Sequence, residues 1–194
     1  MKLPLVSTLV VALAVAAMVA LGVWQLFVRL PEKEAELALL ARNPALPVIA
    51  FPRHPDDALL FRRATIACRP PVTITRAGAG NAGYRLIAAC AGGGLVQLGT
   101  TRDPNGTTAW TGGQVTGRIS HAPDPRPVIA TMFDHSAKPL VLVADAPAPG
   151  LTANSTPDWR LVPNNHLAYA VQWFLFAGIA LVIYGLALRR RKDS

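Results

Sequence analysis

Two long apolar stretches lie at opposite ends of the chain. Leu3–Val28 runs for 26 residues and Leu167–Leu188 for 22 residues without an Asp, Glu, Lys or Arg. About 20 apolar residues cross the hydrocarbon core of a bilayer, so each stretch predicts a transmembrane helix. A signal peptide also begins with a basic residue, but its apolar region is only about 7 to 15 residues long. The first stretch is therefore expected to remain as an anchor.

The segment between the two stretches has the pattern of short strands. Runs rich in β-branched and apolar residues alternate with turns of Gly, Pro, Asn and Asp. Glu32–Arg42, acidic at its start and basic at its end, favours a short helix after Pro31. We therefore expect a membrane protein in which two transmembrane helices flank a β-rich (α+β), antiparallel domain. The predicted strands are Thr65–Cys68, Val72–Thr75, Tyr84–Ala88, Leu95–Leu98, Val115–Ile119, Val128–Phe133 and Leu140–Val143.

Charge sets the expected orientation. The basic run Arg189–Lys192 follows the second apolar stretch directly, and such a cluster holds the end of a membrane helix in the cytoplasm. Two crossings then place both termini in the cytoplasm of a bacterium and the middle of the chain in the periplasm. The expected parts are an N-terminal transmembrane helix (1–30), a periplasmic domain (31–165), a C-terminal transmembrane helix (166–188) and a cytoplasmic tail (189–194). The expected location is the inner membrane.

The formal net charge of +8 also raises nucleic acid as a partner. Away from the C-terminal cluster, however, basic and acidic residues are interspersed and form no basic stripe with aromatic residues. Nucleic-acid binding is therefore not expected. Cys68 and Cys90 fall in the exported segment, where the compartment is oxidising. Because sequence gives neither their distance nor their direction, a disulfide and two free thiols both stay open.

Two short motifs resemble catalytic or cofactor signatures. Gly78–Gly83 matches G-x-G-x-x-G, but a dinucleotide fingerprint opens a helix, whereas this one leads into a strand, so we expect a hairpin connection. Asp134-His135-Ser136 contains the residue types of a hydrolase triad, yet neighbouring side chains on an extended chain point to opposite faces.

The remaining candidate ligands for a metal are scattered. His54, His121 and His135 are expected in loops, and their spacing matches no metal-ligand motif. With no triad and no metal motif, we expect no catalytic residues and no enzyme activity.

His166 stands where the second apolar stretch begins, a depth at which ionisable groups are uncommon and often functional. His166, Tyr169, Ala170 and Trp173 follow the spacing i, i+3, i+4, i+7, which places them on one helix face. A neutral imidazole is a competent axial ligand for haem iron. The alternative is a first helical turn near the headgroups, with Tyr169 and Trp173 in an aromatic belt. The residues alone leave both interpretations open.

Two amides lie inside the apolar stretches at similar depth. At 1.5 Å per residue, Gln25 lies about 7.5 Å and Gln172 about 9 Å inside its helix. An amide that faces lipid is costly, so each is expected to face the bundle interior, toward the other or toward a partner. Ala12, Ala16 and Ala20 repeat every fourth residue and would allow the two helices to approach closely.

Both ends of the chain carry motifs that resemble the Surfeit locus protein 1 family. The resemblance rests on Gly22-Val23-Trp24-Gln25-Leu26 with Arg29 and Lys33, and on Pro163-Asn164-Asn165-His166-Leu167-Ala168-Tyr169-Ala170 with Trp173-Phe174. In the middle, Gly83-Tyr84 followed by Leu95–Thr100 is similar to a family segment that normally runs through Arg-Gly-Trp, and here that Arg and Trp are missing.

Members of that family are assembly factors for haem-copper terminal oxidases, chiefly cytochrome c oxidase. The resemblance implies two spans that enclose a β-rich domain on the positive side of the membrane. It also implies a respiratory-chain role in which haem a is bound and inserted into oxidase subunit I. The family's second-span histidine, matched here by His166, is the candidate iron ligand. The implied partners are oxidase subunit I, other oxidase assembly factors and the lipid bilayer.

These expectations combine into one hypothesis and one rival. In the hypothesis the protein is a haem chaperone: His166 ligates the iron of transiently bound haem a, and Tyr169, Trp173 and Trp24 pack beside the macrocycle. The outer halves of both helices then form the groove for the haem. In the rival, the protein is a haem-free scaffold that stabilises an assembly intermediate of oxidase subunit I.

Overall fold

The computed structural model describes residues 4–124, 126, 129 and 136–193. The chain divides into two compact units. Met1–Leu37 together with Val162–Ser194 forms the first, here called the helical unit, and Ala38–Leu161 forms the second, here called the sheet unit.

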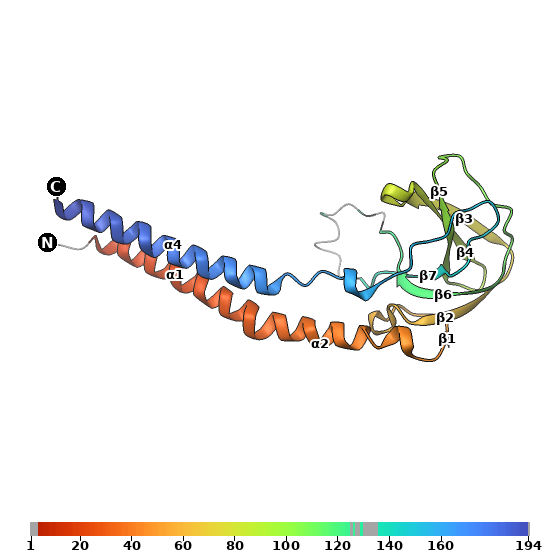
Figure 1. The fold of residues 1–194 in the computed structure, drawn as a ribbon, viewed down its shortest axis with the longest axis horizontal. Coiled ribbons are helices and arrows are strands. Elements are labelled where there is room, and N and C mark those ends of the chain that lie inside the picture. The colour runs from red at the N-terminus through yellow and green to blue at the C-terminus, as the bar shows by residue number, and fades with distance from the viewer. Residues whose placement is uncertain (1–3, 125, 127–128, 130–135, 194) are drawn as a thin grey trace. The chain divides into compact units, whose positions relative to one another are not determined.

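Two long helices run side by side in the helical unit (Figure 1). Helix α1 spans Leu5–Trp24 and helix α4 spans His166–Asp193. The pair is antiparallel, because Thr8 near the start of α1 bonds Tyr184 near the end of α4. The most apolar 18-residue stretches of the first and second helix have mean hydropathies of 2.5 and 2.1. The two predicted long apolar helices are therefore confirmed.

The two helices meet along a seam of mostly small or short side chains. On each helix the least exposed residues alternate between three and four positions apart, the spacing of a left-handed helix pair. Ala12, Ala16 and Ala20 are exposed and lie off this seam, so the prediction that they form the contact is wrong. The seam residues are Thr8, Val11, Val15, Met18, Gly22 and Gln25 on α1, and His166, Ala170, Trp173, Ala177, Ala180 and Tyr184 on α4.

Gly22 marks a close approach between the helices. It is buried, and a Cβ atom added there would lie 2.8 Å from a carbon of the Phe174 ring. Real Cβ atoms do not approach other atoms so closely, so a side chain at Gly22 would push Phe174 away. The absence of a side chain is what lets the two helices come together here.

Helix α1 continues without a break into helix α2. A π-helical turn, η1 (Gln25–Arg29), joins it to α2 (Leu30–Leu40). The expected separate helix Glu32–Arg42 is therefore wrong at its start. Proline lacks an N–H and clashes with the carbonyl four residues earlier in an α-helix. The wider π turn, in which the Leu30 N–H donates to the Gln25 carbonyl, accommodates Pro31 within one continuous helix.

The sheet unit is built on one seven-stranded sheet with the order β1-β2-β6-β7-β5-β4-β3 (Figure 1). Six of the predicted strands are confirmed, each with slightly wider bounds, and the two-residue β1 was not predicted. The expected strand Val128–Phe133 falls almost wholly outside the described residues. The strands are β1 (Ile49–Ala50), β2 (Arg63–Cys68), β3 (Val72–Gly78), β4 (Tyr84–Cys90), β5 (Leu95–Thr101), β6 (Gly113–His121) and β7 (Leu140–Ala144).

The sheet is mixed, so the prediction of an antiparallel domain is wrong in part. Strands β3, β4 and β5 follow one another through short connections and are antiparallel, as tight turns require. Strand β7 enters the sheet between β6 and β5 after a long connection. It is antiparallel to β6 and parallel to β5, and β1 is parallel to β2. A long connection does not fix strand direction, which is why turn signals did not predict it.

The connection at Gly78–Gly83 is a hairpin, as predicted. Strand β3 ends at Gly78, a single 3-10 turn covers Gly80–Ala82, and β4 begins at Tyr84. Gly83 has a φ of 85°, and a Cβ atom there would lie 2.6 Å from the Thr101 carbonyl oxygen. The glycine serves the turn, and no helix follows it to receive a pyrophosphate.

A disulfide fixes the interior of the sheet unit. Cys68 ends β2 and Cys90 ends β4, their Cα atoms lie 5.1 Å apart, and their sulfurs are bonded. Strands β2 and β4 are not neighbours in the sheet, so the bond links its two halves. Around it lies a core of Ala88, Val96, Leu98 and Ala148, against which Ile66, Val72, Ile74, Trp110, Val115 and Leu151 pack.

Candidate functional site

The candidate site lies where α1 ends and α4 begins. His166 is the first residue of α4, and Gln25 is the first residue of the π turn after α1. The His166 Nδ1 atom lies 2.7 Å from the Gln25 side-chain oxygen Oε1, a hydrogen bond that joins residues 141 positions apart in the sequence. Both residues continue the helix–helix seam, so its geometry brings them together.

The second ring nitrogen of His166 remains available. Within the part of the chain that the structure describes, Nε2 makes no hydrogen bond, and it is not among the buried atoms that lack a partner. The imidazole is thus anchored through one nitrogen and accessible at the other. This is the arrangement that a histidine needs to bind a metal ion while its ring orientation stays fixed.

Two of the predicted aromatic neighbours lie on the same stretch of α4 as His166. Trp173 belongs to the seam and is partly buried, whereas Tyr169 is half exposed on the flank of the helix. The Trp173 ring meets Phe176 edge-on, with centroids 6.3 Å apart and planes at 89°. The start of α4 therefore carries one imidazole together with aromatic surface from Tyr169 and Trp173.

Trp24 lies elsewhere. It follows Gly22 by two residues, and residues two apart on a helix do not share a face. Its exposed ring lies under the Arg29 guanidinium, whose central carbon is 5.7 Å from the ring centroid. The structure brings His166, Tyr169 and Trp173 onto one stretch of helix and does not bring Trp24 to the seam that they border.

Gln172 also lies away from the seam. It is exposed on α4, six residues and about 240° around the helix from His166. The expectation that Gln25 and Gln172 face each other is wrong, because Gln25 bonds His166 instead. The two amides lie at similar depth along their helices. The rotation of each residue around its helix axis, however, decides which side chains can meet. The alternative, in which Gln172 faces a partner, stays a prediction.

Asn164, two residues before α4, is a feature that the sequence did not single out as part of the site. Its Oδ1 is the one buried side-chain oxygen or nitrogen, among the residues described, that has no hydrogen-bond partner. Buried polar atoms are nearly always paired, so each exception calls for an explanation such as a bound group. Asn164 therefore adds an unused acceptor close in sequence to His166.

The remaining histidines form no site with one another. Of the residues described, no three His, Cys, Asp or Glu side chains gather in a way that could hold a metal ion. His121 ends strand β6, so its expected place in a loop is wrong, and its Nε2 lies 2.8 Å from an Asp57 oxygen. Asp134 and His135 of the candidate triad lie outside the described residues.

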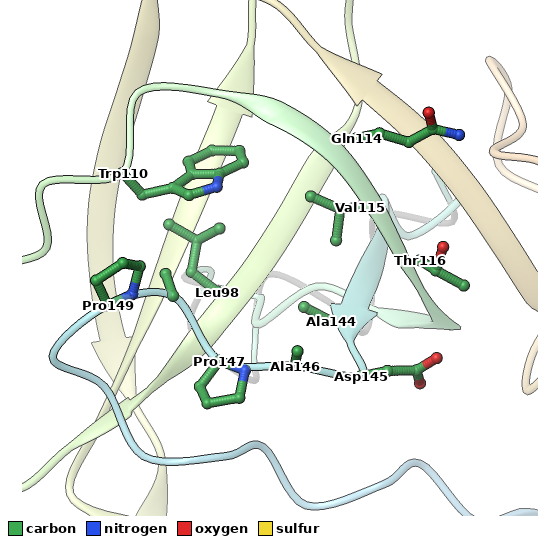
Figure 2. Close-up of a pocket in the computed structure, with 11 residues that line it drawn as sticks. Leu98, Trp110, Gln114, Val115, Thr116, Ala144, Asp145, Ala146, Pro147 and Pro149 are labelled. Atoms are coloured by element: carbon green, nitrogen blue, oxygen red, sulfur yellow. The ribbon is translucent and has the colours of Figure 1, made fainter.

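The sheet unit has a surface pocket of about 370 Å³ between β6 and the segment that follows β7 (Figure 2). Trp110, Leu98 and two prolines, Pro147 and Pro149, make much of its wall (Figure 2). Asp145, the one charged residue of its lining, is paired with Arg63 at 3.1 Å. The pocket thus offers mainly apolar surface, and its one carboxylate is already engaged in an ion pair.

Comparison with known proteins gives a single finding. A family model described as the SURF1 family matches residues 12–178, which is most of the chain and includes Gln25, His166 and the whole sheet unit. No curated protein and no solved structure matches the sequence.

Proposed function

The chain belongs to the SURF1 family, known as a family of cytochrome oxidase assembly factors, and from that premise we propose that it binds haem a through His166 and assists its insertion into oxidase subunit I. Family membership confirms the predicted resemblance. Assembly factors are not a catalytic family, which is compatible with the expectation of no enzyme activity. The observation that carries the haem proposal is the anchored His166 ring with its accessible Nε2.

The surface of the helical unit supports a place in the membrane. In the most apolar 18-residue stretch of each long helix, only 6% is buried inside the protein. Large side chains such as Leu13 and Ile183 are therefore exposed. A water-soluble protein would bury such a surface, and a bilayer supplies the apolar surroundings that it needs. The proposed location is the bacterial inner membrane, in contact with lipid.

Two features support the proposed orientation. The run Arg189–Arg191 at the end of α4 favours the cytoplasmic side for that end, and an even number of crossings brings the N-terminus to the same side. The Cys68–Cys90 disulfide favours an oxidising compartment for the sheet unit. We therefore place both termini in the cytoplasm and residues 31–165 in the periplasm.

The chain's residues near His166 fit a haem. The porphyrin already supplies four nitrogen ligands to iron, so one axial imidazole is sufficient, and no cluster of several protein ligands is required. Tyr169 and Trp173 offer aromatic surface for the apolar faces of the macrocycle. Trp24 would contact the haem only from its own exposed face of α1, away from the seam.

In this proposal His166 would hold the haem by binding its iron through Nε2. A single imidazole ligand is released more easily than a pair of ligands that enclose the metal, and release is what delivery to oxidase subunit I requires. The sheet unit is the proposed contact for subunit I and for other assembly factors.

A haem-free scaffold is the second candidate function. It is favoured by one observation: the bond between His166 and Gln25 also ties the two helices together. In that case His166 stabilises the pair, and the protein holds an assembly intermediate of subunit I without carrying haem.

Co-production of the full-length protein with the enzymes of haem a synthesis separates the two candidates. Haem binding predicts a Soret band in the purified protein, which His166→Ala removes or shifts. His54→Ala, which changes a histidine in the sheet unit, is the matched control and should keep the band. Colourless wild-type protein that still co-purifies with subunit I would support the scaffold, and an unchanged spectrum in His166→Ala would remove His166 from the site.

A further inference from the structure

We infer that Gln25 is a positioning residue that fixes the tautomer of His166, so that Nε2 is the ring nitrogen left free to bind a metal. The inference rests on the proposed function, in which His166 ligates haem iron. It gives a role to a residue 141 positions away from the ligand in the sequence. Gln25 acts through His166 and has no contact with the metal itself.

The direction of the hydrogen bond carries the inference. An amide oxygen only accepts hydrogen bonds, so the 2.7 Å contact between Gln25 Oε1 and His166 Nδ1 requires the proton to reside on Nδ1. A neutral imidazole has a single N–H, and its other nitrogen then holds a lone pair. Metal-binding histidines use this same arrangement, in which the non-ligating N–H is donated to a fixed acceptor.

The position of Gln25 makes the bond a fixed one. Gln25 follows Gly22 by three residues, the spacing of the seam, and is partly buried there. Its backbone carbonyl accepts from the Leu30 N–H inside the π turn. Of the residues described, Gln25 is the one whose side chain bonds the His166 ring. Without it, no other contact within the described residues would select one tautomer over the other.

The chain supplies a matched control in Gln172. It is the same residue type, lies near the same end of the helix pair and is exposed on the face of α4 away from the seam. A change at Gln172 removes an amide from the apolar helices without touching His166. Any effect seen at Gln25 and absent at Gln172 is therefore due to the bond and not to the loss of a polar group.

The first measurement needs no haem. Full-length protein labelled with ¹⁵N-histidine is placed in lipid nanodiscs at mildly alkaline pH, and the His166 signals are assigned by their loss in His166→Ala. Protonated and bare ring nitrogens give well-separated ¹⁵N signals. We expect a protonated Nδ1 and a bare Nε2 in the wild type and in Gln172→Leu.

Two variants at Gln25 separate hydrogen bonding from packing. Gln25→Met keeps the volume but removes the acceptor, and should shift His166 toward the tautomer with the proton on Nε2. Gln25→Glu keeps an acceptor and should preserve the wild-type pattern. A wild type with the proton on Nε2, or a Gln25→Met protein with wild-type signals, would overturn the inference.

The second measurement is haem a binding to the same proteins. Loss of a hydrogen-bond partner behind a metal ligand typically lowers affinity by about 10- to 100-fold, so Gln25→Met should bind haem a more weakly by that factor and Gln172→Leu as the wild type does. Wild-type protein that binds no haem a contradicts the proposed function, while the ¹⁵N result still decides the tautomer. Wild-type binding that is equal in Gln25→Met contradicts the positioning role alone.

Discussion

The two units of this protein bury opposite kinds of side chain. In the sheet unit the interior holds large aliphatic residues, and Leu98, Ile119 and Leu142 are among its fully buried side chains. In the helical unit the buried residues include Gly22, Ala170 and Ala177, whereas the large aliphatic residues lie on the outside. The sheet unit buries the side chains that a protein in water is expected to bury, and the helical unit exposes the side chains that a helix pair in lipid is expected to expose.

The difference explains how each unit is held together. The sheet unit gains stability by removing large apolar side chains from water and adds a disulfide between the halves of its sheet. In the proposed membrane location, two helices in lipid have no such driving force, so close packing of small residues and interhelical hydrogen bonds would hold the pair. The helical unit has both: the approach at Gly22, and one hydrogen bond near each end, Thr8–Tyr184 and Gln25–His166.

The largest difference between the two units is expected when one leucine in each unit is replaced with alanine. Leu142 is fully buried in the sheet unit and Leu175 of α4 is 59% exposed. Leu142→Ala should lower the free energy of unfolding of the sheet unit by about 2 to 5 kcal/mol, since it removes buried surface and leaves a cavity. Leu175→Ala should change stability by less than about 0.5 kcal/mol. Urea unfolding of the full-length protein, followed by circular dichroism, measures both; equal losses would contradict the assignment of inside and outside.

The disulfide gives the next largest effect and is confined to the sheet unit. Replacing both Cys68 and Cys90 with Ala opens a link between residues 22 positions apart. The expected loss is about 3 kcal/mol in the unfolding of the sheet unit, because the unfolded chain gains freedom. The same urea experiment measures it. If the helix pair is also lost in this variant, its stability depends on the sheet unit, and the two units are not stabilised independently.

Gly22 tests the packing of the helical unit. Gly22→Leu forces a side chain against the Phe174 ring and should weaken the pair by about 1 to 3 kcal/mol. Gly178→Leu is the control, since a Cβ atom at Gly178 meets nothing within 4 Å. Unfolding of the helices by SDS in mixed micelles compares the two variants. Equal stability of the two variants would contradict the close approach of the helices at Gly22.

The smallest effect is expected at the hydrogen bond near the start of α1. Tyr184→Phe removes the hydroxyl that bonds Thr8 and should cost about 0.5 to 1.5 kcal/mol of helix-pair stability. Tyr169→Phe serves as the control, because Tyr169 is half exposed and its hydroxyl makes no hydrogen bond to the described residues. The SDS experiment applies again. If Tyr184→Phe is as stable as the control, the helix pair is held by packing and gains nothing from this hydrogen bond.

The sequence predicted those features that follow from composition and local pattern. Charge-free runs of sufficient length indicated the two helices, and turn residues indicated six of the strands. The direction of β7 was not predictable, because a long connection leaves it free. The pairing of Gln25 with His166 was not predicted either. Depth along a helix gave no rotation around it, and the π turn that begins at Gln25 departs from the 100° per residue on which helical patterns rest.

Part of the candidate site was nevertheless visible in the sequence. An imidazole at the start of an apolar helix, with Tyr169 and Trp173 at helical spacing, indicated the segment on which the candidate site lies. The alternation of three and four residues that leads through Gly22 to Gln25 is visible only in the burial of α1, because the sequence of this helix is apolar on every face. Asn164 gave no signal, since an asparagine before a helix is usually a cap. Only its burial without a partner sets it apart.

The most direct test is the visible absorption spectrum of full-length wild-type protein, purified in mild detergent from cells that make haem a. An anchored His166 with an open Nε2 predicts a protein that carries haem a and shows its Soret band. Protein that stays colourless although the cells contain ample haem a would contradict the haem-carrying account.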